Sequence, residues 1–369
     1  MDFDLNEDQV MIRDMVARMA EETILPLAEE IDNTAVIPDE ITGMLAELNL
    51  FGIFGDEDVG GAGLDLISYL LIMEEIGSAS GSLGIILAYH NSLGVLPLLK
   101  SGKKDILPSL CSGEKLISFG HLEHETDYSS APRNTIAMAD DGNYTVTGEK
   151  LLVPSPPKTG YYIITARFED KPAIFLVEAE SPGLSRSEPV ETIGGRGVDF
   201  RDLKLENVKS NLLCKGEEAE NLFGLMVAHC SLALSAVSCG IMKRCLKDSI
   251  SYAQQRVQFG SPIIDFPLVQ NHLTEIARLL ETSRQLVLRA SAGEITGPSP
   301  RVSLARWHSS TSATDCGLRA IQIHGGYGYS REYPLERYLR DIQTINPLVG
   351  SEEIHRNIIF QYLNKGGVL

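Results

Sequence analysis

Two carboxylates open the last long helical segment of the chain and could accept a proton. They are Glu352 and Glu353 in the stretch NPLVGSEEIHR, residues 346–356. A general base must lie within hydrogen-bonding distance of the proton that it removes. In the first turn of a helix, a carboxylate is also stabilised by the positive end of the helix dipole. The spacing therefore allows proton transfer here, but it favours interaction with the helix N-terminus.

Histidines and cysteines are the other side chains that could transfer protons. His121 and His124 lie close together, and histidine is a frequent acid–base residue. The six cysteines form no Cys-x-x-Cys pair, so we expect no metal site. The N-terminus MDFDLNEDQVMIRD is acidic and polar, unlike a targeting signal. We therefore expect reduced thiols and a cytoplasmic protein.

The composition is that of a globular protein with excess negative charge. The chain has 369 residues, of which 43% are hydrophobic, and its net charge is −18. This charge argues against nucleic acid and anionic membranes as partners. We also expect no membrane span, which would need an apolar run of about 20 residues. A polyanionic ligand would need local basic contacts.

Helical, β-type and helical segments follow one another along the chain. Residues 1–115 have apolar residues at helical spacing, and Asn6 could cap the first helix. Residues 116–215 contain short β-type runs separated by turn residues. Residues 216–369 return to helical patterns, with four helices of bundle length. We predict an α+β multidomain chain: an N-terminal α-helical domain, a middle β-domain and a C-terminal four-helix bundle.

Two stretches carry a specific family resemblance. They are YAQQRVQFGSPIIDFPLVQ (252–270) and RAIQIHGGYGYSREYPLERYLRD (319–341). Together with LPSLCSGEKLISF, TVTGEK and GGRGVDFRDLKLENV, in this order, they resemble the acyl-CoA dehydrogenase family. The resemblance covers nearly the whole chain and implies that family's fold.

The resemblance also implies a chemistry. In this family a glutamate removes the α-proton of an acyl-CoA, and FAD takes the β-hydrogen as hydride. An electron-transferring flavoprotein is the expected electron acceptor. Each FAD lies across a dimer interface, where one subunit holds the flavin ring and its neighbour holds the pyrophosphate and adenine.

By this resemblance, the residues that contact a neighbour's pyrophosphate and adenosine are intact. The matching residues are Arg256, Phe259, Gln270, Gln322, Gly325 and Gly326. A guanidinium such as that of Arg256 pairs well with phosphate oxygens. Gly325 and Gly326 lack side chains, so the backbone can approach the cofactor. Taken singly, the arginine could be a helix-end cation and the glycines a helix stop.

The residues that would hold the chain's own flavin ring depart from the family pattern. Leu122 stands for the threonine that hydrogen-bonds the ring, and Leu152 for the aromatic residue that packs on it. Pro154 stands for the threonine near flavin N5, and proline also lacks a backbone donor. Residues 125–127, Glu-Thr-Asp, replace the Gly-Ser that helps to hold coenzyme A. A normally bound flavin ring is therefore hard to reconcile with this chain.

The family's catalytic glutamate is replaced by Val349, which cannot accept a proton. Some members carry their base on the long helix instead, at the position of Cys230. A thiolate base needs a positive neighbour, and His229 would point about 100° away on a helix. Ala228 and Ser231 stand where many members have an aspartate and an arginine that contact coenzyme A.

The pattern leaves four interpretations open. The favoured one is a subunit without its own base that completes the FAD site of a paralogous acyl-CoA dehydrogenase subunit, as an α2β2 complex. The alternative partner is a second copy of this chain. The second interpretation is an independent enzyme that carries out elimination or desulfination on an acyl-CoA with His121, His124 or Asp127. The third is a dehydrogenase with a relocated base, and the fourth is a non-enzymatic binding protein.

Overall fold

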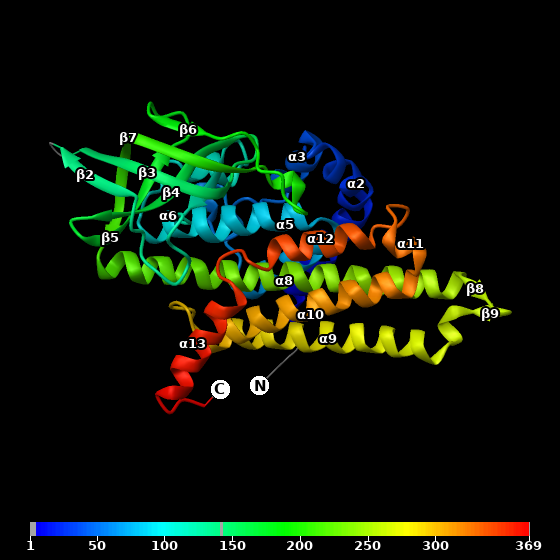
Figure 1. Cartoon of the computed structure of the whole chain (residues 1–369). Coiled ribbons are helices and arrows are strands. Elements are labelled where there is room, and N and C mark those ends of the chain that lie inside the picture. The colour runs from blue at the N-terminus through cyan, green and yellow to red at the C-terminus, as the bar shows by residue number, and fades with distance from the viewer. Residues whose placement is uncertain (1–4, 141–142, 369) are drawn as a thin grey trace.

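The computed structural model describes residues 5–140 and 143–368. Its parts are a set of N-terminal helices, a sheet, and helices arranged around the long helix α8 (Figure 1). The sheet lies beside the beginning of α8, and a small hairpin lies at its far end (Figure 1). Helical, strand and helical elements thus follow one another as predicted.

The N-terminal helices form an apolar layer against α8. They are α1 (Glu7–Met19), η1 (Ala20–Ile24), α2 (Leu25–Thr34), α3 (Asp39–Glu47), η2 (Glu57–Val59), α4 (Leu66–Ala79), α5 (Gly81–Ala88), η3 (Tyr89–Val95), α6 (Leu96–Lys100) and α7 (Leu107–Cys111). Asn6 caps α1 as predicted. Its side-chain oxygen accepts from the backbone N–H of Gln9, and the side-chain oxygen of Gln9 accepts from the backbone N–H of Asn6. Helix α4 is buried over most of its surface, as its continuous apolar pattern predicts.

The middle part of the chain is a sheet that closes on itself. Its strands are β1 (Leu116–Gly120), β2 (Ile136–Asp140), β3 (Asn143–Pro154), β4 (Thr159–Phe168), β5 (Lys171–Glu178), β6 (Leu184–Arg186) and β7 (Phe200–Lys215). The order is β1-β4-β2-β3-β7-β5, and β5 also pairs with β4. Closure encloses a small apolar core that includes Tyr162 and Phe175.

The C-terminal part is built on α8, which has 39 residues. The elements are α8 (Glu217–Gln255), β8 (Val257–Gln258), β9 (Ser261–Pro262), η5 (Ile263–Asp265), α9 (Pro267–Ser291), α10 (Pro300–His324), α11 (Gly326–Tyr329), α12 (Leu335–Ile345) and α13 (Glu352–Asn364). The short helix η4 (Arg196–Val198) belongs to the middle part and precedes β7. Four of these helices are those predicted as a bundle. The sequence analysis did not separate the shorter α11 and α12.

Two helical stretches correct the expectation that no apolar run approaches the length of a membrane span. Residues 81–100 and helix α8 are long and apolar enough by length and composition alone. Their most apolar windows are 94% and 78% buried inside the protein. Both are therefore core helices of the fold. All six cysteines are free and buried, three of them on α8.

A glycine-rich loop before β7 fixes the sheet to the helices. The backbone N–H of Gly195 donates to Oδ1 of Asp341 at 2.7 Å, and that of Gly197 donates to Oγ of Ser82 at 3.2 Å. A Cβ on Gly194 would lie 2.3 Å from the backbone of Arg340, so the loop and α12 can touch only without a side chain there.

Candidate cofactor and substrate sites

The turn between α12 and α13 carries Val349, which the sequence resemblance aligns with the family's glutamate. The side chain is 1% exposed, and the backbone has φ +52°. A β-branched residue in the left-handed region is strained. Such strain persists only where the surrounding structure holds it. Valine supplies no proton acceptor, so the turn keeps an unusual backbone shape without a catalytic side chain.

A buried arginine holds this turn. Arg306 of α10 is fully buried, and its Nη2 donates to the carbonyl of Ile345 at 2.5 Å. The carbonyls of Asn346 and Leu348 are each 3.4 Å away. Burial lowers the pKa of Arg306 to about 10. The cation lies at the C-terminal end of α12, where the helix dipole favours positive charge.

The nearby carboxylates are directed elsewhere. Oε1 of Glu352 accepts from the indole of Trp307 at 2.8 Å, and the same carboxylate pairs with Arg356. Glu353 is exposed. Both lie in the first turn of α13, as their spacing predicted. Neither supplies a base at Val349.

Cys230 does not supply the missing base either. Its thiol is fully buried in α8, and burial raises its pKa far above the ordinary value, although Arg306 has a smaller opposite effect. The thiol therefore stays protonated. His229 is turned away and donates from Nδ1 to the carbonyl of Leu225 at 3.0 Å.

The side chains at the three flavin-ring positions, Leu122, Leu152 and Pro154, carry no hydrogen-bond donor. The carbonyl of Leu122 accepts from the backbone of Leu151 at 2.9 Å. The backbone N–H of Leu152 donates to Oδ1 of Asp202 at 2.9 Å. Pro154 has no N–H and lies buried at the end of β3. These three side chains would therefore give the polar edge of a flavin ring no hydrogen bond.

A buried polar network joins the segment after β1 to strands β3 and β4. Nζ of Lys150 lies 2.8 Å from Oε1 of Glu123, and both side chains are buried. Oγ1 of Thr165 is 2.9 Å from Nδ1 of His121, whose Nε2 donates to the carbonyl of Asp127 at 3.0 Å. Because a carbonyl only accepts, Nε2 carries the proton and Nδ1 accepts from the threonine.

Burial sets the charges in this network. It lowers the pKa of His121 to about 4 and the pKa of Lys150 to about 8. Burial opposes ionisation of Glu123, but Lys150 outweighs it and lowers the carboxyl pKa to about 2. His121 is therefore neutral with both nitrogens engaged. His124, the other histidine singled out by the sequence, is exposed.

His121 also lines a cleft of about 480 Å³ between the sheet, α8 and α13. Aromatic rings form one wall: the ring centroids of Tyr128 and His121 are 5.1 Å apart, and Phe223 lies 4.6 Å from His121. The other lining residues are Ser129, Ser130, Ala131, Pro132, Thr165, Pro172, Ala173, Ile174, Ala219, Glu220, Gly224, Pro298, Ile354, Asn357 and Ile358. The size and apolar walls are typical of a small-molecule site.

A second hollow lies at the far end of α8 and has a volume of about 500 Å³. It brings together Arg256, Gly325 and Gly326. The Arg256 guanidinium lies 5.6 Å from the ring centroid of Tyr327, and it has no ion-pair partner among the described residues. No atom lies within 4 Å of a Cβ built on Gly326. A free cation beside open backbone fits the phosphates of FAD.

The other three predicted contacts lie outside this hollow. Phe259, at the tip of the β8–β9 hairpin, is 97% exposed and has φ +52°. Nε2 of Gln270 donates to the carbonyl of Ile264 at 3.1 Å. Gln322 is exposed near the end of α10. All three belong to the same end of the helical layer, where a neighbouring molecule can reach them.

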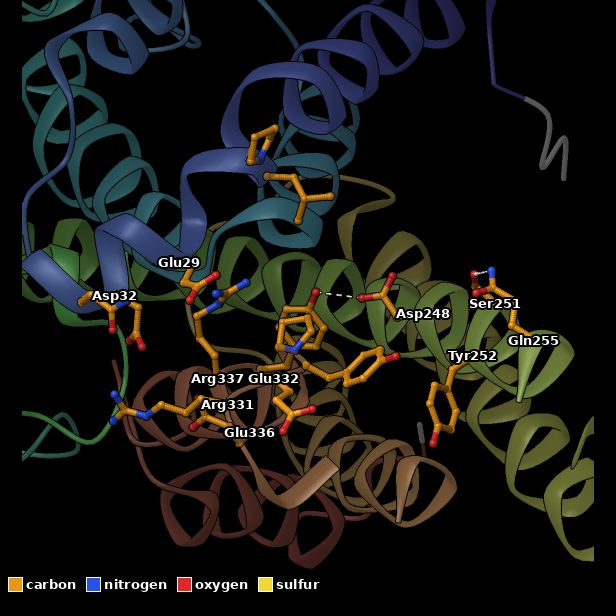
Figure 2. Close-up of a pocket in the computed structure, with 16 residues that line it drawn as sticks. Glu29, Asp32, Asp248, Ser251, Tyr252, Gln255, Arg331, Glu332, Glu336 and Arg337 are labelled. Atoms are coloured by element: carbon orange, nitrogen blue, oxygen red, sulfur yellow. Dashed lines mark hydrogen bonds between the residues drawn. The ribbon is translucent and has the colours of Figure 1, made fainter. Parts of the chain in front are cut away.

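A charged cavity of about 510 Å³ adjoins this hollow, and Tyr252 and Glu332 line both. Figure 2 shows Glu29 and Asp32 of α2 facing the segment that contains Arg331 and Arg337, with Asp248 and Tyr252 of α8 to one side. The dashed line to Asp248 marks its bond from the hydroxyl of Tyr338, at 2.8 Å (Figure 2). Three carboxylates of this cavity also form ion pairs: Asp32 and Glu336 with Arg340, and Asp248 with Arg244.

Sequence reasoning missed the buried charges. Lys150 ends the stretch TVTGEK in β3, whereas Glu123 lies in the loop after β1. Their pairing therefore forms only when the chain folds. Arg306 had a signal, because it recurs at helical spacing with the buried residues Val302 and Ser309. A charged residue on an apolar helical face requires a partner, and here the partners are the carbonyls of the turn between α12 and α13.

Known proteins share this fold and sequence. The family model "Acyl-CoA dehydrogenase, C-terminal domain" matches residues 226–363, and "Acyl-CoA dehydrogenase, N-terminal domain" matches residues 6–114. The chain is 34% identical to a probable acyl-CoA dehydrogenase, YngJ, of Bacillus subtilis, over 99% of this chain and 100% of that protein.

Two solved structures are similar over nearly their whole length. Butyryl-CoA dehydrogenase from Megasphaera elsdenii is 27% identical, with a TM-score of 0.92, and 99% of this chain and 100% of that chain are covered. The prolyl acyl carrier protein oxidase AnaB is 26% identical, with a TM-score of 0.92, and the coverage is 98% and 100%. The chain therefore belongs to the acyl-CoA dehydrogenase family of oxidoreductases.

Proposed function

We propose that this chain is a subunit of an FAD-dependent acyl-CoA dehydrogenase that lacks its own catalytic base. It completes the FAD site of a paralogous, active subunit in a cytoplasmic α2β2 complex. The observation that carries the proposal is the buried, base-free turn at Val349. The exposed Arg256 and the open backbone at Gly326 support it from the other side.

This chain's own residues would act on the partner's cofactor by binding and positioning. Arg256 pairs with the FAD diphosphate, and Gly325 and Gly326 let the backbone approach it. Phe259, Gln270 and Gln322 contact the adenosine part. Bound FAD supplies the hydride acceptor for oxidation of an acyl-CoA in the partner, with an electron-transferring flavoprotein as the next acceptor.

Cofactor stoichiometry tests the proposal. The chain is purified alone and after co-expression with a paralogous acyl-CoA dehydrogenase from the same genome, and visible absorbance and released FAD are measured. We expect a colourless lone chain and a yellow mixed complex with about one FAD per two chains, since each site needs one catalytic ring side. One FAD per chain in the lone protein, or no mixed complex, would contradict the proposal.

A second candidate is an independent enzyme with changed chemistry on an acyl thioester. The cleft of about 480 Å³ beside His121 favours it. In the structure His121 is neutral and its nitrogens are engaged, so the candidate requires movement of the Asp127 carbonyl. It predicts product formation from an acyl-CoA by the lone chain, and loss of that activity in His121→Phe. Retained turnover in His121→Phe would remove this role.

A further inference from the structure

Arg306 carries a buried positive charge that no carboxylate neutralises in the part of the chain that the structure describes. It takes part in no ion pair among those residues. The acidic groups whose charges act on it are Cys230 and Tyr89. Burial raises the pKa of both, so both stay protonated and uncharged. A buried cation without a counter-charge is costly, and such charges are normally paired.

The carbonyls of the turn between α12 and α13 satisfy one nitrogen of this guanidinium. Nη2 donates to the carbonyl of Ile345 at 2.5 Å, and the carbonyls of Asn346 and Leu348 are each 3.4 Å away. Nε and Nη1 are buried and have no hydrogen-bond partner among the described residues. Both nitrogens carry N–H groups, which only donate. They therefore require an acceptor other than the carbonyls of the turn.

Two more side chains at the same turn have buried polar atoms without a partner in the described part of the chain. They are Oδ1 of Asn346, at the end of α12, and both ring nitrogens of His355, in the first turn of α13. The His355 ring faces the turn, because a Cβ built on Gly350 would lie 3.3 Å from its Nε2. Burial, followed by the charge of Arg306, lowers the pKa of His355 to about 4. The ring is therefore neutral and offers one N–H.

The chemistry of these atoms favours an anion over water alone. Water both donates and accepts, so it can satisfy the unpartnered atoms, but it leaves the charge of Arg306 uncompensated. A monovalent anion accepts from the N–H groups of Arg306 and His355 and also neutralises the cation. Because both side chains are buried, the ion must be small and must shed most of its water.

A second buried histidine shows that an unpartnered nitrogen is not sufficient for such a site. His90 is 1% exposed, and its Nε2 also has no partner among the described residues. Burial lowers its pKa to about 4, as for His355, but no charged side chain contributes to this shift. A water can satisfy such a nitrogen, since there is no charge to neutralise. The buried cation therefore distinguishes the site at Arg306.

We propose that a small monovalent anion of the size of chloride binds at the turn between α12 and α13, against Arg306 and His355. It neutralises the cation beside residues 346–351, which include no carboxylate of their own. The site is separate from the cleft beside His121 and from the hollow at Arg256, because Arg306 and His355 line neither. The proposal stands whether or not the chain completes a partner's FAD site.

Thermal unfolding of the full-length chain in sodium chloride tests the proposal in solution. Sodium gluconate replaces the chloride at constant ionic strength, because gluconate is too large for a buried site of this kind. We expect the unfolding midpoint to rise by at least about 2 °C between no chloride and about 200 mM chloride, since a ligand that binds only the native state stabilises it. Bromide should act as chloride does. A midpoint that does not depend on chloride would overturn the proposal.

Two matched variants assign the effect to this site. His355→Phe keeps an aromatic ring but removes the N–H, and it should weaken the apparent chloride affinity at least about fivefold. His90→Phe makes the same change where no charged side chain acts on the ring, and it should leave the chloride response unchanged. The response is measured within each variant against gluconate, so a lower stability of either variant does not affect the comparison. An unchanged response in His355→Phe, or an equal loss in both variants, would contradict the site.

Anomalous diffraction from crystals of the unsubstituted chain grown in sodium bromide locates the ion directly. This measurement avoids Arg306→Met, which would also release the carbonyls of the turn. The expected result is a bromide peak in contact with Nε or Nη1 of Arg306. Water at these nitrogens without an anomalous signal would overturn the proposal and assign the unpartnered atoms to buried water.

Discussion

At the scale of single residues, Val349 combines the loss of a proton acceptor with an unfavourable backbone conformation. The left-handed region costs an L-residue about 1–2 kcal/mol relative to glycine. The turn nevertheless keeps this shape, because Arg306 binds the carbonyls before it. Arg306 thus holds a strained turn in which Val349 offers no proton acceptor.

This strain predicts an inverted preference between glycine and alanine. Val349→Gly should be more stable than Val349→Ala by about 1 kcal/mol, because only glycine adopts the φ of +52° without cost. Chemical denaturation of the two variants measures the difference. Val177, buried in β5 and outside the positive-φ set, is the control. There alanine should be the more stable replacement, and the same order at both sites would argue against strain at Val349.

Asp341 predicts a pH dependence of stability. Burial raises its pKa from 3.8 to about 6, so the native state holds this proton more tightly than the unfolded chain. Its contribution to stability is therefore present below the unfolded pKa and is lost as the pH rises through about 6. The unfolding free energy of the wild type, minus that of Asp341→Asn, should fall by up to about 3 kcal/mol between pH 4 and pH 7.

Denaturation curves at several pH values check this difference. The substitution keeps the shape of the side chain and an oxygen for the Gly195 N–H. The comparison between the two proteins cancels the titration of groups elsewhere. A difference that is constant with pH would mean that Asp341 titrates normally.

At the scale of elements, α4 and α8 approach so closely that glycines are required at their crossing. A Cβ on Gly240 would lie 2.0 Å from the carbonyl oxygen of Glu74, and one on Gly77 would lie 2.6 Å from that of Val237. The close crossing holds the N-terminal helices against the helix that carries Cys230 and ends at Arg256. The distance between α4 and α8 therefore affects how the N-terminal helices are placed against α8.

Gly240→Ala should accordingly cost about 3 kcal/mol or more, because backbone cannot move aside as a flexible side chain can. Gly43, in the middle of α3, is the matched control because nothing lies within 4 Å of its Cβ position. There alanine should stabilise the protein by about 0.5–1 kcal/mol. Thermal unfolding of both variants decides the matter, and a neutral Gly240→Ala would disprove the close approach.

At the scale of the whole molecule, the two ends of α8 face different tasks. The first end borders the cleft lined by Glu220, and the far end presents Arg256, which forms no ion pair with the part of the chain that the structure describes, beside exposed aromatic residues. In a chain of net charge −18, the exposed guanidinium of Arg256 places a positive charge beside the open backbone of Gly326. Our proposal assigns the far end to a partner's FAD diphosphate.

Arg256→Met is therefore expected to lower the FAD affinity of the mixed complex about ten- to a hundredfold, the effect of losing one charge-assisted bond. Fluorescence titration of the stripped complex with FAD measures it. Arg301→Met, at the opposite end of α10, removes an exposed cation as a control. Equal FAD affinity of the complex with either variant and with the wild type would exclude Arg256 from the cofactor site.

The sequence by itself determined the order of elements and the family. Apolar spacing predicted the helical, strand and helical parts, and the cap at Asn6 could be identified from its type and position. The prediction that Val349 stands for the family's glutamate also comes from the sequence, because the motif around it matches without gaps. Local patterns and motifs suffice where the interaction lies within a few residues along the chain.

Only the tertiary structure decided which side chains meet. It pairs Lys150 with Glu123, places Arg306 against the turn between α12 and α13, and directs Glu352 to Trp307. It also places His121 and Glu220 in the same cleft. These contacts join residues far apart in sequence, and their energies depend on burial. Burial is a property of the folded chain and cannot be read from neighbours in the sequence.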